Sequence, residues 1–507
     1  MRKIPKTSNG SLTLGRSLAA AGCLMLSGCN IPSAPETKDV MDPHLAGQIP
    51  ENWRASNSSS HPDNDWVRSF NDAKLNQLVA SALTHNPAMA VAEANVEASR
   101  AAVRIAGARL YPWVAAKGLV ERQGMNLDGA IDRGIDAPNI GSIGGGAGID
   151  TGGSSPGSRS VDKSSRTWVS GLGAAAAWEP DLWGRVRSGR EAARQGSLAA
   201  EADYFGVQQA IAAQTAKAWF AAIEAGELVA LAEDAVKAYG ELKSLADTRK
   251  EQGAASDLDI AQVKARVDSG NNLLLTSRAA SIQALRAVEA LTGNYPKGAL
   301  RARGFPALPG RVPAGLPSQL LERRPDVVAA ERKFAAAFHR TTEARTARLP
   351  RFSLSVSGGL GSNQLDGVGT LNGVMWSLAS GVTQPIFLGG QLKAAEDLRK
   401  AEQKGAAASY TGVVLRAFQE VETGLALDPV LRQREGVLTS QVQSTSEAER
   451  LSRVSFDVGK TSMFEVLELY GRSLAAKAEL IRFRSQRLAE RVNLHLALGG
   501  GFRGGQK

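Results

Sequence analysis

The sequence predicts an α+β membrane protein, built from two internal repeats, in which long helices carry four short β-strands. Three observations predict this fold. Proline-marked helix starts recur along the chain at fixed offsets. Four segments of about ten residues have the length that a tilted strand needs to cross a bilayer. Two very long stretches are dominated by helix-forming residues, which predicts helices far longer than those of an ordinary globular domain.

The first 28 residues predict a secretory signal. A basic stretch ends at Arg16, and the short apolar segment Ser17–Leu26 leads into Leu26-Ser27-Gly28-Cys29. That segment is too short to span a bilayer as a stable helix. The ending resembles a bacterial lipobox, which predicts cleavage before Cys29 and a covalent lipid, palmitate included, on that cysteine. The alternative is a plain signal with an incidental cysteine.

Residues 29–65 are expected to be a lipidated tether between the membrane and the folded body, because prolines and a serine tract favour extended chain. Two acyl chains anchor a protein stably where one does not. Asn30 follows the cysteine, and it favours the outer membrane because aspartate at that position favours inner-membrane retention in enteric lipoproteins.

The two repeats are expected at residues 66–310 and 311–502, followed by a short tail at 503–507. Pro87 and Pro325 each start a helix and lie 238 residues apart, whereas Gly253 and Gly459 lie 206 apart. About 32 additional residues must therefore lie in the first repeat. The glycine-rich stretch near residues 125–163 accounts for them and predicts an extracellular loop.

The strands are expected at Trp113–Arg122, Thr167–Trp178, Arg351–Ser357 and Val374–Gln384. Arg351–Ser357 alternates apolar and polar residues most cleanly, with Phe352, Leu354 and Val356 on one face. Four strands cannot close a barrel, and lipid does not tolerate an open edge. Three copies with four strands each would close a twelve-stranded barrel, which predicts a homotrimer embedded in outer-membrane lipid.

Two long helices are expected, one from Gly184 to about Lys250 and one from Gln391 onward, with Pro429 as a kink. At about 1.5 Å per residue, the first would be on the order of 100 Å long. The heptad spacing of Leu467, Leu474 and Ile481 indicates coiled-coil packing.

These motifs resemble TolC-type outer-membrane factors, and among them the NodT-type lipoproteins of RND efflux systems. The resemblance covers roughly residues 65–502, and its marks are Trp178-Glu179-Pro180-Asp181-Leu182-Trp183-Gly184-Arg185, the stretch from Gly315 to Asp326, and the ending Ala497–Phe502. It implies a trimeric barrel continued by a periplasmic coiled-coil tunnel. It also implies an exit duct for small molecules, partnered by a periplasmic adaptor (membrane fusion) protein and an inner-membrane RND transporter.

In this family the adaptor docks at the tips of helical hairpins, which here are residues 249–256 and 455–462. The implied docking residues are Arg249, Gly253, Ser256, Asp457, Gly459, Thr461 and Ser462. Turn chemistry alone explains the two glycines equally well, because a helix reversal needs a residue that tolerates positive φ. Ser455 stands where the family pattern has arginine, and Asp457 is a candidate for a charged ring at the closed end.

Nothing in the sequence indicates an enzyme, a metal site or a cofactor beyond the lipid. Gly459-Lys460-Thr461 is not a phosphate loop, because Val454 replaces the required glycine. The five histidines lack metal-ligand spacing. The net charge of +10 is mild for 507 residues, so nucleic acid is not expected as a partner. A lipid-anchored periplasmic coiled-coil adaptor or scaffold is the main alternative, although it does not explain the strands.

Overall fold

A computed structural model describes residues 32–35, 49–50, 52–54, 65–126, 164–310, 312–362 and 374–501. The expected signal peptide, Cys29, nearly all of the glycine-rich loop and the C-terminal tail lie outside these residues. The chain divides into two compact units. A strand unit holds Ile105–Arg187 and Glu343–Ala394, and a helical unit holds Pro32–Arg104, Ser188–Thr342 and the chain from Ala395 onward.

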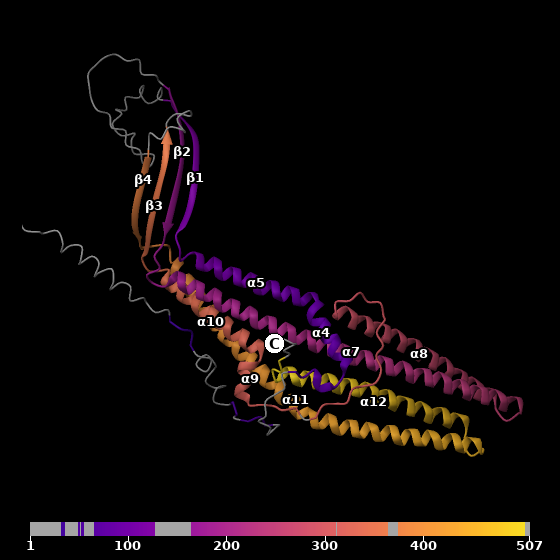
Figure 1. The fold of residues 1–507 in the computed structure, drawn as a ribbon. Coiled ribbons are helices and arrows are strands. Elements are labelled where there is room, and N and C mark those ends of the chain that lie inside the picture. The colour runs from indigo at the N-terminus through magenta and orange to yellow at the C-terminus, as the bar shows by residue number, and fades with distance from the viewer. Residues whose placement is uncertain are drawn as a thin grey trace, which may run out of the picture. The chain divides into compact units, whose positions relative to one another are not determined.

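The element order is the same in both halves of the chain (Figure 1). After the short 3₁₀ helix Arg68–Phe70, the first half has α4 (Ala73–His85), α5 (Pro87–Ala108), β1 (Trp113–Asn126), β2 (Ser164–Trp178), α7 (Arg185–Glu251) and α8 (Asp257–Leu291). The second half has α9 (Pro317–Arg323), α10 (Pro325–Thr346), β3 (Arg351–Ser362), β4 (Val374–Thr383), α11 (Gln391–Asp457) and α12 (Met463–Ala497). Helices α5 and α10 both have 22 residues, α7 and α11 both have 67, and α8 and α12 both have 35.

The predicted helices and strands are confirmed, with small shifts at their ends. Strands β1, β2 and β3 extend four, three and five residues beyond the predicted bounds, because ladder pairing continues into polar and glycine-containing sequence that shows no alternation. Pro429 lies inside α11, which the structure assigns as one continuous helix. Among the described residues, no helix combines the length and the hydropathy that a membrane span requires.

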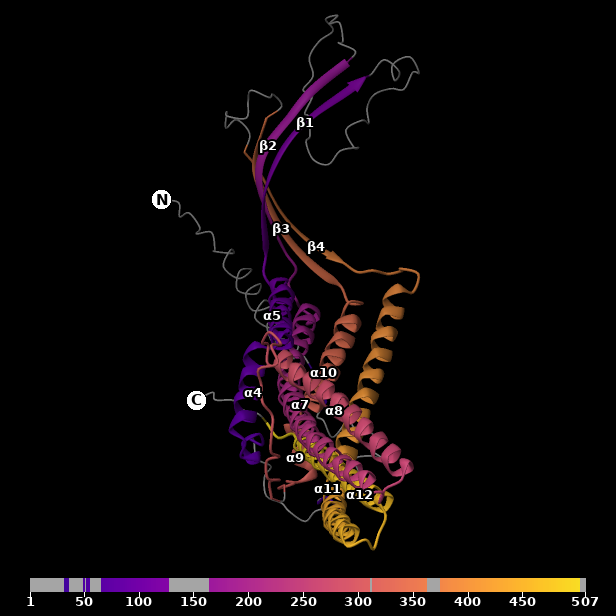
Figure 2. The ribbon, with the colours of Figure 1, turned by 90° about the vertical axis from the view of Figure 1, so that its right-hand side faces the viewer.

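The strand unit is a four-stranded antiparallel sheet in the order β1-β2-β3-β4, so β1 and β4 form its edges (Figure 2). Its register separates two faces, because side chains alternate along a strand and cross-strand partners share a face. One row consists of Val114, Ala176, Val356 and Leu378. The adjacent row, on the opposite face, consists of Ala115, Ala175, Ser357 and Ser377. One face is therefore apolar and the other is small and polar.

The helical unit has a core along its bundled helices. The largest cluster centres on Trp66, Phe70, Trp219 and Phe220, which join α4, α7, α8 and α12. Alanine fills many of the remaining buried positions of α7, which allows neighbouring helices to approach closely. This packing fixes the helical hairpins against one another.

Part of the predicted tether is packed against the helical unit. Trp53 is buried, and its indole Nε1 donates to the carbonyl of Ala314 at 3.2 Å. Its ring meets that of Phe418 edge-on at 6.0 Å between centroids. The tether therefore has an anchoring point at Trp53, and a buried aromatic side chain of this size contributes substantially to packing.

Candidate functional site at two hairpin turns

The first turn connects α7 to α8 through a left-handed glycine. Gly253 has φ +72°, and the amide of Ala254 donates to the carbonyl of Arg249 at 2.7 Å. This 6→1 bond is typical of a Schellman ending. Ser256 then caps α8, and its backbone and hydroxyl both donate to the Asp259 carboxylate, at 2.9 and 2.7 Å. The turn is therefore fixed by its own sequence, as predicted.

The second turn, between α11 and α12, has the same construction. Gly459 has φ +77°, and the amide of Lys460 donates to the carbonyl of Ser455 at 2.8 Å. Ser462 caps α12 by accepting from the amide of Glu465 at 3.3 Å, and the Thr461 hydroxyl donates to the Glu465 carboxylate. A Cβ atom at either turn glycine would meet nothing within 4 Å, so only the positive φ requires glycine there.

The two turns lie side by side at one end of the helical unit (Figure 1). A shared cluster joins all four helices, with Val263 of α8, Phe456 of α11 and Tyr470 of α12 buried in it. Tyr470 meets Tyr239 of α7 edge-on at 5.0 Å, and burial raises the pKa of Tyr470 to about 12. The hairpins therefore form one packed end rather than two independent tips.

Arg249 connects the turns directly. Its guanidinium carbon lies 3.9 Å from the centroid of the Phe456 ring, and Nη2 donates to the Phe456 carbonyl at 3.2 Å. Sequence reasoning identified Arg249 but missed Phe456. The available signal was that Phe456 is the one aromatic residue in the two predicted tip segments. Ser455, which stands in the position of a second arginine, directly precedes the ring that Arg249 covers.

The outer surface of this packed end mixes apolar and polar side chains. Leu258, Val454, Val458 and Phe464 are exposed large apolar residues. Asp457 and Ser462 are exposed beside them. Lys250 and Asp257 form a 2.6 Å ion pair across the first turn; the hydrogen bond between them raises the pKa of Lys250 and lowers that of Asp257. Such a surface suits a protein contact rather than a reaction.

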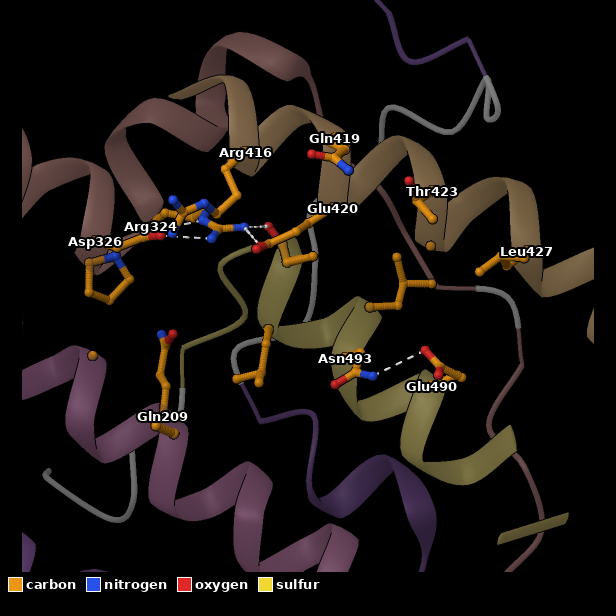
Figure 3. A pocket seen from close by; sticks show the side chains of 17 residues that line it. Gln209, Arg324, Asp326, Arg416, Gln419, Glu420, Thr423, Leu427, Glu490 and Asn493 are labelled. Atoms are coloured by element: carbon orange, nitrogen blue, oxygen red, sulfur yellow. Dashed lines mark hydrogen bonds and ion pairs between the residues drawn. The ribbon is translucent and has the colours of Figure 1, made fainter. Parts of the chain in front are cut away.

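A charged cavity of about 750 Å³ lies elsewhere in the helical unit, between α7, α10, α11 and α12 (Figure 3). Arg324 dominates it, with Asp326 at 2.7 Å, Glu420 at 2.6 Å and the Ala497 carbonyl at 3.2 Å. Burial alone would raise the pKa of Asp326, but its hydrogen bond to Arg324 and the charge of that residue lower it overall. All three partners accept hydrogen bonds from one guanidinium, so we interpret the network as a structural contact that holds the helices together.

No group of three or more potential metal ligands occurs among the described residues.

Residues 78–294 and 316–500 match the outer membrane efflux protein family. The chain belongs to this family. The match covers most of the sequence and includes both hairpins. Among its relatives, the efflux pump outer membrane protein TtgC of Pseudomonas putida, described as probable, is 29% identical over 95% of this chain and 93% of its own. Outer membrane protein OprJ of Pseudomonas aeruginosa is 31% identical over 86% of each chain.

Solved structures agree with this membership. The open state of the MtrE outer membrane channel of Neisseria gonorrhoeae superposes with a TM-score of 0.74 at 27% identity, covering 90% of this chain and 96% of that one. The protein is thus an efflux channel of the outer membrane and not an enzyme, and its helical unit is periplasmic. The alternative of a coiled-coil adaptor or scaffold is not supported.

Proposed function

We propose that three copies of this efflux channel close a twelve-stranded barrel, with the apolar sheet face towards lipid and the small, polar face towards the lumen. One observation carries this proposal, namely the register that separates Val356 and Leu378 from Ser357 and Ser377. Unpaired strand edges are not tolerated in lipid, and β1 and β4 are both edges within one chain. Pairing β4 of one copy with β1 of the next removes all of them.

The long helices of three copies then continue the barrel as a tunnel. The two halves of the chain act as internal repeats, which the equal lengths of α7 and α11 support. A trimer of two repeats presents six related hairpin turns in one ring. Those turns dock a periplasmic adaptor, through which the channel serves an inner-membrane RND transporter.

Small organic molecules are the proposed cargo. Two proteins from Pseudomonas putida that are similar to this chain are named a toluene efflux pump outer membrane protein and an antibiotic efflux pump outer membrane protein. The small side chains of the polar sheet face, Ala115 and Ser357 among them, suit a lumen that offers no specific binding pocket. Discrimination between cargoes is then expected to lie in the transporter.

An experiment in cells tests this function. Deleting the gene in its host should raise the intracellular accumulation of a fluorescent pump substrate and the sensitivity to small toxic organic compounds. The cloned gene should restore both. Unchanged accumulation in a host stripped of other channels of this family would contradict the proposal.

A further inference from the structure

Within the strand unit, side-chain donors connect the segments at which strands and helices meet. There are four such segments, at residues 109–112, 179–184, 347–350 and 384–390. Trp178 Nε1 donates to the Leu110 carbonyl at 3.0 Å, and Trp183 Nε1 donates to the Pro350 carbonyl at 2.7 Å. Gln384 Nε2 donates to the Arg348 carbonyl at 3.1 Å. Each segment therefore holds the one beside it.

These contacts follow the repeat. The offsets of 238 and 206 turn the pair Leu110 and Trp178 into Arg348 and Gln384, so two of the three bonds are equivalent. The bond from Trp183 to Pro350 differs because it joins the first half of the chain to the second. Pro180 and Gly184 of the same segment correspond to Pro385 and Gly389 at an offset of 205, so the equivalent of Trp183 is Leu388, and the offset of 238 makes Pro112 the equivalent of Pro350. The equivalent contact would therefore join Leu388 to Pro112. Those residues adjoin β4 and β1, which are opposite edges of the sheet. The equivalent contact can therefore form only between two copies.

The exposure of side chains in these segments indicates that a neighbouring copy covers two of them. In the first half, Leu182 and Trp183 are 38% and 39% exposed, whereas their equivalents Phe387 and Leu388 are 84% and 49% exposed, and the adjoining Ile386 is 90% exposed. On the receiving side, Tyr111 is 71% exposed, although its equivalent Leu349 is only 39% exposed. Two segments at opposite sheet edges thus lack the cover that their equivalents have within the chain. Exposed apolar residues of this size indicate an interaction surface.

A hollow lies beside the receiving segment. It has a volume of about 570 Å³, and its lining includes Arg109, Tyr111, Trp113 and Trp178. A hollow with aromatic walls suits an apolar side chain from a neighbour. The distinct apolar segment at the other edge meets the requirement of a heterologous interface, in which two different surfaces of the protomer pair around a ring.

We propose that residues 385–389 of one copy seat against residues 109–113 of the next copy, with Leu388 beside Pro112 and Phe387 next to the aromatic hollow. The contact repeats between chains what Trp183 and Pro350 do within a chain. This inference rests on the proposed trimer and adds to it the residues that each copy contributes.

Cysteine cross-linking in isolated outer membranes tests the proposal. The full-length chain carries Tyr111→Cys together with Leu388→Cys and is treated with a short bismaleimide. Denaturing gels should then show covalent dimer and trimer. The matched control, Leu349→Cys with Trp183→Cys, occupies the equivalent positions and should remain at monomer mobility, because its link forms within one chain. Each single variant should also remain monomeric.

The outcomes separate the inference from the proposed assembly. A trimer without treatment, combined with no covalent ladder from the Tyr111→Cys, Leu388→Cys protein, would overturn the inference and leave the trimer standing. An untreated parent that is not trimeric would overturn both. If Leu388→Cys prevents assembly, Phe387→Cys replaces it, and the same ladder decides.

Discussion

The guanidinium of Arg249 covers the ring of Phe456 at 3.9 Å and also donates to the carbonyl of that residue. These residues lie 207 positions apart and end different helical hairpins. A single arginine thus ties the α7–α8 turn to the α11–α12 turn. Ser455 stands at the equivalent position of the second turn, so the arginine contact is made from the first turn only.

Arg249→Ala should loosen the packed end without unfolding the rest of the helical unit. A cation–π contact of this kind contributes about 0.5–1 kcal/mol. Amide hydrogen exchange at both turns should accelerate up to about fivefold. Phe456→Ala should accelerate exchange more, because it also removes a buried ring from the shared cluster, at about 3–5 kcal/mol. The double variant should show less than the sum of the two effects. Strictly additive effects would show that the two residues act independently.

Gly459→Val should strain the second turn, because a non-glycine residue at φ +77° costs at least about 1–2 kcal/mol. We expect normal trimers, weak cross-linking to the periplasmic adaptor and greater sensitivity of cells to pump substrates. Gly240→Val is the matched control, because Gly240 lies inside α7 with open space around it and no positive φ. If the Gly459→Val protein cross-links and exports like the parent, the turn is not the docking site.

Gly359→Ala should impair sheet assembly. A Cβ atom there would lie 2.7 Å from the Leu172 carbonyl oxygen and 3.0 Å from the Gly173 Cα atom, both of which are backbone of the paired strand. Its neighbour Gly358 provides the control, because a Cβ atom at that position comes no closer than 3.7 Å. The yield of trimer that resists SDS without heating should fall for Gly359→Ala and not for Gly358→Ala. Equal yields would mean that the strands separate easily at this point.

The Arg324 network predicts a defined pH dependence. The pKa of Asp326 in the folded protein lies below its ordinary value of 3.8. Because the pKa of Asp326 is lower in the folded protein than in the unfolded chain, its interactions stabilise the fold at pH values above the unfolded-state pKa. That stabilisation is lost as the pH falls through the folded-state pKa. The difference in melting temperature between the parent and Asp326→Asn should therefore be constant from pH 7 to about 5 and shrink below 3.8. A difference that grows on acidification would contradict this sign.

Removing the arginine should cost more than removing one acid. Arg324→Ala deletes hydrogen bonds to two carboxylates and one carbonyl, at roughly 1.5–3 kcal/mol for a bond to a charged group. The carboxylates left behind are half-exposed, which limits the penalty. The melting temperature of the purified channel should fall further than in Asp326→Asn. An equal or smaller fall in melting temperature would indicate that Asp326, rather than the guanidinium, contributes most to the stability of this network.

Lipidation at Cys29 stays a prediction from the sequence, because that residue lies outside the described part of the chain. Mass spectrometry of the mature N-terminus should find acyl chains, palmitate included, on Cys29. Cys29→Ser should abolish acylation. A free amine at another residue, without diacylglycerol, would refute the assignment.

Much of the fold was predictable, because proline, glycine and long alanine-rich runs act locally. The turns at Gly253 and Gly459 are predictable from their own sequences. The alternation of apolar and polar residues in Arg351–Ser357 likewise predicts a strand. The two-faced character of β1 and β2 was not visible, because alanine and glycine stand on both faces. Only the register shows that Ala176 shares a face with Val356.

The candidate site was predictable only in part. Arg249 was found through its motif, whereas its partner Phe456 depends on how two hairpins pack. The anchoring of Trp53 against Ala314 was missed for the same reason, since the surrounding segment has the composition of a flexible linker. Contacts between residues this distant arise from tertiary packing, and no local pattern encodes them.

Native mass spectrometry of the full-length channel, extracted in a mild detergent, counts the chains in each particle and so tests the trimeric barrel. We expect particles of three chains, because four strands per copy close a barrel only when copies join edge to edge. A stable monomer or dimer that still conducts across a lipid bilayer would contradict it.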